Sequence, residues 1–362
     1  MSGTENQATG AYQQPDYELT INGTNITPRV GKRLIELRLR ESRGEEADQL
    51  DLTLDDSDGR MAIPPKGATI SIRLGWLNEG MVDKGSFVVD EVEHGGSPDR
   101  ISVRARSAEM AKSLRERASH SWNDSTVGTV VRDIAARNSL PARIAPELAE
   151  RKVQHIDQTN ESDLHFLSRL ARQHDAVATV KKGQLIFLRT NHRTNASGQP
   201  IAPMHIVRAS GDQHRWHTAD RTSYTGVRAY WHDGKHARRK GVVAGNTTGS
   251  VKTLKDTFSS AEAARQAAQS EMQRVDRGAA TLSLALALGR PHLMPQAAVT
   301  VEGFKPEIDG EGWLVKSVEH ALGDGGFTTQ IELERQGNGD AQAQDDADDA
   351  DDAATEIPDD GN

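Results

Sequence analysis

Two pairs of closely spaced histidines are the best candidates for metal ligands in this sequence. They are His214/His217 and His232/His236. If Asp233-Gly234 forms a two-residue hairpin turn, strand alternation places His232 and His236 on opposite faces, which is wrong for one metal ion. His214 and His217 also face opposite ways if they lie on one strand. We therefore interpret both pairs as surface or packing residues and expect no metal site.

Two glutamate–histidine dipeptides could also do chemistry. Glu93 precedes His94, and Glu319 precedes His320. The two glutamates would act as paired catalytic carboxylates only if the segments that carry them faced each other across a cleft, and the sequence gives no sign of this. We interpret the histidines as groups that stabilise turns through hydrogen bonds, with a pH-sensing role as the alternative.

Signatures of familiar active sites are absent from the sequence. It has no G-x-S-x-G elbow, no Walker A loop, no G-x-G-x-x-G and no H-E-x-x-H. The acidic turn at residues 55–59 lacks the spacing and the distal glutamate of an EF-hand. The absence of cysteine also excludes disulfide frameworks and thiolate metal sites. We expect a protein that is not an enzyme and has no cofactor.

One basic stretch, Arg228–Lys240, contains Tyr230 and Trp231. Basic residues interleaved with aromatics can bind single-stranded nucleic acid, but such a run is more often a strand edge protected by its charges. The chain has a net charge of −9, and removing the ten acidic residues between Gly337 and Asn362, where no basic residue lies, leaves +1. A nearly neutral body without a basic recognition helix argues against sequence-specific nucleic-acid binding.

The two ends of the chain differ from its body. Residues 1–15 are polar, lack the apolar core of a secretory signal and are expected to form a flexible arm. Residues 337–362 are rich in aspartate and nearly free of large apolar residues, so we expect a disordered acidic tail. No apolar run approaches the ~20 residues that span a bilayer, and no membrane partner is expected.

The candidate residues are positioned by a hairpin pattern that occurs twice. The first copy is Phe87–Ala105 and the second Trp313–Ile331, and the two align without a gap. Each has an alternating apolar strand, a turn with glycine and a second alternating strand. The equivalent apolar positions should lie in the core of both copies: Phe87, Val89, Val92, Trp313, Val315 and Val318. The polar positions between them are the candidate interface residues: Asp90, Glu91, Glu93, Lys316, Ser317 and Glu319.

The repeat divides the chain into two similar β domains. Short alternating strands with turn residues between them predict a β-barrel or sandwich at 16–107 and another at 204–336. Between them, helical and short strand patterns predict a small α/β module at 108–190, followed by a polar linker at 191–203. The predicted fold class is mainly β with an α/β insertion.

Three segments of the sequence resemble one known family. Gln158–Asp163 with the apolar residues after it, Lys252-Thr253-Leu254 before an alanine-rich helix, and Trp313–Thr329 are similar to segments of the phage late control D proteins. The resemblance covers about residues 15–336. Members of this family are baseplate or tail hub proteins of contractile-tailed phages and R-type pyocins, related to the hub part of type VI secretion spike proteins.

The resemblance implies a structural role and a set of partners. It implies that the two β domains are tube-like and that a homotrimer of the chain forms a ring with pseudo-six-fold symmetry. This ring would connect the tail tube protein to a separate trimeric spike, with tape-measure and baseplate wedge proteins as further partners. The expected location is the baseplate of a virion or tail-like particle, assembled in the bacterial cytoplasm. A tail-tip cell-wall hydrolase, a secretion-system spike component and a transcriptional regulator are the alternatives.

Overall fold

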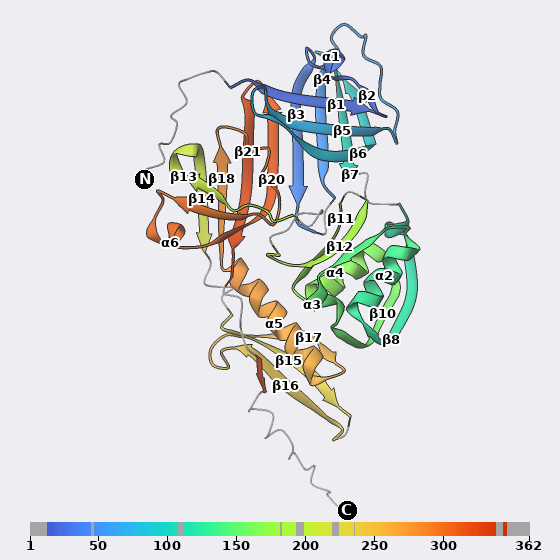
Figure 1. Ribbon diagram of the computed structural model, residues 1–362, viewed down its shortest axis with the longest axis vertical. Helices are drawn as coiled ribbons and strands as arrows, with labels where there is room; N and C mark the ends of the chain where they lie inside the picture. The colour runs from blue at the N-terminus through green and yellow to red at the C-terminus, as the bar shows by residue number, and fades with distance from the viewer. Residues whose placement is uncertain are drawn as a thin grey trace, which may run out of the picture.

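The computed structural model places a large β-sheet above two smaller bodies that contain the longer helices α2 (Val127–Arg137), α4 (Asp163–Gln173) and α5 (Ala261–Gly278) (Figure 1). It describes residues 13–44, 47–107, 112–181, 183–192, 199–218, 224–234, 236–337 and 343–345. Antiparallel strands dominate, and the prediction of a mainly β fold with an α/β insertion is confirmed. No helix among these residues is long and apolar enough to cross a membrane.

The first half of the large sheet is built from strands whose apolar residues alternate. In β3 and β4, for example, Leu37, Leu39, Leu50 and Leu52 are buried while the residues between them point outward. The long strand β6 bends, so its first part pairs with β5 and its second part with β7. The elements of this half are β1 (Pro15–Ile21), β2 (Thr24–Asn25), α1 (Thr27–Val30), β3 (Leu34–Ser42), β4 (Gln49–Asp55), β5 (Thr69–Trp76), β6 (Gly80–Gly95) and β7 (Arg100–Ser107).

The second half of the sheet repeats the strand order of the first. The order β3-β4-β7-β6-β5-β1 recurs as β14-β18-β21-β20-β19-β13, although β13 pairs parallel to its neighbour where β1 pairs antiparallel. The elements are β13 (Met204–Val207), the 3-10 helix η2 (Arg208–Ser210), β14 (Gly211–Thr218), β18 (Ala280–Leu286), β19 (Ala298–Glu302), α6 (Pro306–Asp309), β20 (Trp313–Gly323) and β21 (Gly326–Arg335).

Matching β-bulges show which residues of the two halves are equivalent. The pairing of β6 with β7 shifts at Asp90, and the pairing of β20 with β21 shifts at Lys316, the residue aligned with it. The pairing of β3 with β4 shifts at Ile35, and that of β14 with β18 shifts at Asp212. Because a bulge bends its strand at a fixed place, these positions align the two halves residue by residue.

The gapless alignment of the two hairpins is wrong beyond their first strands. Gly95 pairs with Arg100, whereas its counterpart Ala321 pairs with Thr328, so the second hairpin is two residues longer. The longer tip carries Phe327 into the core of the first half, where its ring lies 5.3 Å from that of Trp76. The second hairpin is longer because it joins the two halves.

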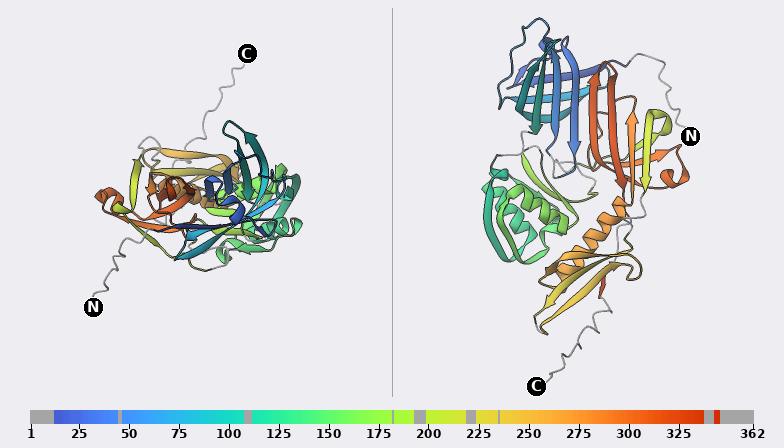
Figure 2. Two further views of the ribbon diagram at one scale, coloured as in Figure 1. Left: turned by 90° about the horizontal axis from the view of Figure 1, so that it is seen from above. Right: turned by 180° about the vertical axis from the view of Figure 1, so that it is seen from behind.

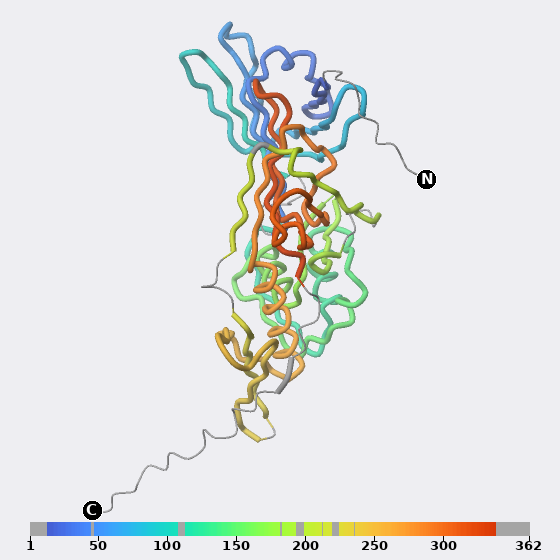
Figure 3. Tube along the Cα trace, turned by 90° about the vertical axis from the view of Figure 1, so that its left-hand side faces the viewer, coloured from blue at the N-terminus to red at the C-terminus, as the bar shows by residue number. Residues whose placement is uncertain are grey.

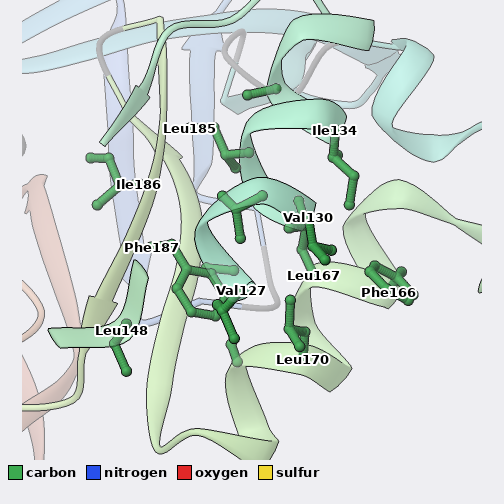
Figure 4. Close-up of a cluster of buried hydrophobic side chains, with 14 of the residues drawn as sticks. Val127, Val130, Ile134, Leu148, Phe166, Leu167, Leu170, Leu185, Ile186 and Phe187 are labelled. Atoms are coloured by element: carbon green, nitrogen blue, oxygen red, sulfur yellow. The ribbon is translucent and has the colours of Figure 1, made fainter. Parts of the chain in front are cut away.

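The α/β module has its own core between two helices and a three-stranded sheet (Figure 4). Figure 4 shows α2 side chains such as Val130 and α4 side chains such as Leu167 pointing toward Phe187 of β12. The elements are η1 (Lys112–Arg115), β8 (Arg117–Thr126), α2 (Val127–Arg137), β9 (Ala142–Ile144), α3 (Pro146–Ala149), β10 (Lys152–Ser162), α4 (Asp163–Gln173), β11 (Ala176–Lys181) and β12 (Gln184–Arg189).

A second, smaller insertion lies between β14 and β18. Its sheet has the order β17-β15-β16-β22, and α5 covers one face through alanines such as Ala264 and Ala268. Seen from the side in Figure 3, α5 and this sheet continue the line of the main sheet downward. The elements of the insertion are β15 (Gly226–Asp233), β16 (Arg238–Gly245), β17 (Val251–Phe258) and α5 (Ala261–Gly278), and β22 (Ala343–Asp345), which follows β21 in the sequence, adds a strand to its sheet.

Three expectations from the sequence need correction here. The Asp233-Gly234 turn is longer than two residues, because Asp233 pairs with Arg238. The acidic segment 337–362 is not wholly unstructured, because β22 pairs with β16; residues 338–342 and 346–362 lie outside the described part. The first strand already begins at Pro15, within the predicted arm, whose residues 1–12 also lie outside it, as do residues 193–198 of the predicted linker.

Replacing Phe327 by alanine should destabilise the whole chain. The ring fills the core of the opposite half, so its removal leaves a cavity and should lower the free energy of unfolding by about 3–5 kcal/mol in urea denaturation. Phe304→Ala, at a half-buried position, is the control and should cost less. Equal effects of the two substitutions would contradict the role given to the hairpin tip.

Candidate assembly interface

Strands β3 and β20 join the two halves into one sheet. They pair antiparallel from Ser317 opposite Ser42 to Gly323 opposite Glu36. Trp76 of the first half adds a hydrogen bond from its indole nitrogen to the carbonyl oxygen of Gly289, at 3.0 Å. The two halves of the chain are therefore joined by antiparallel strand pairing at this junction.

A buried charged cluster lies behind the junction. Lys84 Nζ donates to Glu41 Oε2 at 2.6 Å and to the carbonyl oxygen of Leu293 at 3.1 Å. His320 is fully buried, lies 3.5 Å from the same glutamate and bonds Thr329 Oγ1 through Nδ1 at 2.9 Å. Glu41 and Lys84 both belong to the first half, and His320 on β20 of the second half lies against their ion pair.

The protonation states of the cluster follow from burial and charge. Burial alone would raise the pKa of Glu41, but the adjacent Lys84 and His320 hold this pKa far below its usual value. Burial lowers the pKa of His320, and the positive charge of Lys84 lowers it further against the opposing effect of Glu41. The cluster is therefore a lysine–glutamate ion pair beside a neutral histidine near pH 7.

A second polar network ties both insertions to the sheet. Arg277 of α5 forms a bidentate ion pair with Asp175, which follows α4, and its Nε lies 3.2 Å from Glu334 of β21. Glu334 also accepts a bidentate pair from Arg43, in the loop after β3. These links fix the α/β module and the smaller sheet at one end of the main sheet, as the right-hand view in Figure 2 shows.

A cavity of about 230 Å³ lies next to these networks. The main sheet, the α/β module and the loop around Met294 line it. Its charged groups are already engaged with one another, since Lys84 pairs with Glu41 and Lys181 with Asp48. Burial lowers the pKa of Lys181, as expected for an ammonium group in an interior seam. The cavity is a seam between domains whose lining is largely apolar apart from these paired charges, and we assign no ligand to it.

Two of the strand edges of the main sheet that lack a partner strand in the described part of the chain are equivalent to the edges that pair at the junction. β14 pairs only with β18, and Asp90–Gly95 of β6 pairs only with β7. By the bulge alignment, the β14 edge is equivalent to β3, and this β6 edge is equivalent to the part of β20 that receives β3. An unpaired edge presents free backbone donors and acceptors to another chain.

The two edges differ in charge and carry an exposed aromatic side chain. Asp90, Glu91 and Glu93 lie along the β6 edge, and the β14 edge holds Arg215 between histidines. Trp216 sits opposite Leu282 on the core side of β14, yet it is 37% exposed. A tryptophan left open at the end of a core indicates a surface that an assembly covers.

The predicted core residues lie on the inner side of both halves. Phe87, Val89, Trp313, Val315 and Val318 are buried, and Val92 is half-buried because the edge beside it is open. The half-exposed Glu319 lies on the polar side, and Glu93 is exposed. Ser317, by contrast, is buried and bonds Glu332 at 3.1 Å.

The polar side of the sheet is covered by cross-strand ion pairs. Arg104 bridges Asp51 and Glu91 at 3.0 and 2.7 Å, and Arg106 lies 2.9 Å from Asp90. In the second half, Lys316 lies 3.8 Å from Glu332. Opposite charges on facing strands compensate each other, so this side carries little net charge.

The residues considered for catalysis or metal binding do not converge. The described residues contain no group of three or more side chains that could hold a metal ion. His214 packs edge-on against Phe304, and His236 bonds Asp233 at 2.8 Å. His94 and His320 occupy equivalent places but differ, because only His320 is buried under a neighbouring strand.

Sequence reasoning missed Glu41, Lys84 and Trp216. Glu41 breaks the leucine alternation of β3 on the core side, and this break was the one available signal for the cluster. Nothing in the sequence pairs it with Lys84, because the contact depends on the bend in β6. Trp216 lies in a run without apolar alternation, so its edge position could be recognised only from the pairing.

Comparison with known proteins gives a consistent result. The family model described as phage tail baseplate hub (GPD) matches residues 35–326. The probable baseplate hub protein of Escherichia phage 186 is 39% identical over 90% of this chain and 94% of its own length. The 43 kDa tail protein of prophage MuSo2 from Shewanella oneidensis has the same fold, with a TM-score of 0.67, 15% identity and coverage of 89% and 99% of the two chains. The Escherichia coli c3393 protein, a type VI secretion component described as structurally similar to bacteriophage T4 tail proteins, aligns with a TM-score of 0.54, 17% identity and coverage of 91% and 79%.

Removing one charge of the buried cluster should cost more than removing both. Lys84→Met leaves Glu41 buried without its partner and should lower the free energy of unfolding by about 3 kcal/mol. The double variant Lys84→Met/Glu41→Gln should recover most of that loss in the same denaturation experiment. Additive losses from the two substitutions would show that the pair is not coupled.

His320 should make stability depend on pH. Because its pKa is held below the usual 6.5, the unfolded chain binds a proton that the folded chain excludes as the pH falls below 6.5. Stability is therefore complete above that pH and declines below it. His320→Gln should flatten the decline between pH 7 and pH 5 by an amount on the order of 1 kcal/mol, measured by urea unfolding. An unchanged decline in the His320→Gln variant would contradict this account.

Proposed function

This chain belongs to the phage tail baseplate hub (GPD) family, and from this premise we propose that three copies close into a ring with pseudo-six-fold symmetry. Each chain contains two units with the same strand order, so three chains supply six similar units. A closed ring pairs the β14 edge and the Asp90–Gly95 edge of β6 in every chain, whereas an open chain of subunits would leave one of them free at each end. These two edges, unpaired among the described residues, are the observation that carries this proposal.

The junction inside the chain serves as the template for the contact between chains. If β14 of one chain binds β6 of the next as β3 binds β20, then Trp216 lies opposite His94 of the partner subunit. In the same register, His217 lies opposite the partner's Glu93. The partner's Glu93 thus faces His217, two residues from Arg215, and Trp216 is covered. Main-chain hydrogen bonds between the added strands supply affinity in this type of contact.

The proposed ring matches two different symmetries at its two ends. Its six similar units suit a six-fold tail tube, and its three chains suit a three-fold spike. The α/β module and the smaller sheet occur once per chain and lie together at one end, so we assign that end to the spike and the opposite end to the tube. Tape-measure and baseplate wedge proteins are further partners in this scheme, and the place of action is the baseplate of the assembled particle.

The chemistry of the polar side supports a structural role without catalysis. We assign this side of the sheet to the lumen of the ring. Its basic side chains are paired with carboxylates, as Arg104 is with Asp51 and Glu91. Paired basic side chains would hold a passing polyanion only weakly. In this scheme Glu93 lies on the β6 edge and Glu319 faces the lumen, and neither acts as a catalytic carboxylate. Cell-wall hydrolysis by the purified protein would overturn the assignment.

Disulfide trapping tests the proposed contact directly, because the natural chain has no cysteine. Glu93→Cys/His217→Cys should give covalently linked dimers and closed trimers on a non-reducing gel after mild oxidation, since directly opposed residues of paired strands lie within disulfide reach. Light scattering should show three 39.4 kDa chains per particle before oxidation.

The matched control is the equivalent pair inside one chain, Arg40→Cys/Glu319→Cys. It should form an intrachain disulfide at a similar rate and no linked oligomer. Each single variant should give no closed trimer. A monomer in light scattering, or efficient linking of the control pair alone, would contradict the ring.

A further inference from the structure

The core of the first half is capped by two residues of the second half. Leu322 and Phe327 face each other in the hairpin of β20 and β21, and both belong to the core cluster of the first half. Leu322 pairs with Leu37 across the junction, and the ring of Phe327 lies 5.3 Å from that of Trp76 at the end of β5. An apolar hairpin tip therefore closes this end of the first core.

The second half has the equivalent place without such a cap. Its core cluster, among the described residues, contains no residue of the first half. By the bulge alignment His214 takes the place of Leu37, and Phe304, which follows a glycine just after β19, takes the place of Trp76. The rings of His214 and Phe304 lie 5.1 Å apart, and the guanidinium of Arg208 lies 5.5 Å from the ring centre of Phe304.

A charged residue stands at the tip that would cover this place in the ring. If β14 pairs with β6 as β3 pairs with β20, the partner's Gly96 lies opposite His214. Asp99, which faces Gly96 across the hairpin of β6 and β7, then takes the place of Phe327. Its carboxylate occupies the space that a Cβ on Gly96 would need, so it lies on the side of the hairpin that faces the neighbouring half.

Asp99 and Arg208 both lack a partner of opposite charge. Each is exposed, and neither forms an ion pair within the described part of the chain. The contact of Arg208 with Phe304 holds the guanidinium at the open end of the second core. The template of the inner junction brings the carboxylate of one chain to the guanidinium of the next.

We propose that Asp99 of each chain forms an ion pair with Arg208 of its neighbour, and that this pair selects the β6 and β14 edges for each other. The inference rests on the proposed ring. The junction inside the chain forms as the chain folds and can use an apolar cap. The junction between chains is exposed before assembly, so a charged cap keeps the free edges soluble. Complementary charges then fix the register and exclude wrong partners.

Reversing one charge should break the pair, and reversing both should restore it. Arg208→Asp and Asp99→Arg each place two like charges at every contact, so each should raise the protein concentration at which half of the trimer dissociates by at least about tenfold. Arg208→Asp/Asp99→Arg restores opposite charges at every contact and should bring this concentration to within about threefold of that of the natural chain. Analytical ultracentrifugation over a range of concentrations measures all of them.

The matched control is Arg132→Asp, which reverses the charge of an exposed arginine on α2 in the α/β module and should leave the trimer unchanged. Single variants that assemble as the natural chain does, or losses that add up in the double variant, would overturn the ion pair and leave the ring in place. A natural chain that sediments as a monomer would instead overturn the ring and this contact with it.

Discussion

The pairing of β3 with β20 is the constraint on which the rest of the molecule depends. It turns two similar half-sheets into one continuous sheet and fixes their mutual orientation. A slip of one residue would turn the side chains of β20 to the other face relative to β3, moving His320 away from Glu41 and Phe327 out of the core of the first half. The register is therefore set by apolar burial and by the contact of His320 with the buried Glu41.

The insertions adapt the two equivalent units to different tasks without altering the sheet. The loop between β3 and β4 is short, and the equivalent place between β14 and β18 holds the smaller sheet and α5. Arg277 and Glu334 tie that insertion to the main sheet, and Asp175 ties it to the α/β module. One end of each chain is thus specialised, while the strand edges that can meet a neighbour stay alike.

The sequence predicts the features that depend on the local alternation of apolar and polar residues. It does not predict the features that depend on contacts between segments far apart in the chain. Alternating leucines in β3, β4 and β18 indicate strands and their buried faces, and the repeated Val-Glu-His segments reveal the duplication. The added length of the second hairpin could not be foreseen, because Phe327 packs in the core of the other half. Glu41 and Lys84 could not be paired from the sequence, since only the bend in β6 brings them together. Among the predicted interface residues, Ser317 is buried and the edge residue Trp216 was missed.

The most direct test of the proposed ring is a map of the assembled hub at a resolution that separates strands. The account predicts one unbroken sheet around the ring, with β14 of each chain beside β6 of the next and Trp216 across from His94 of the partner subunit. A map in which the β14 edge faces solvent, or in which chains meet through the α/β modules instead, would contradict it.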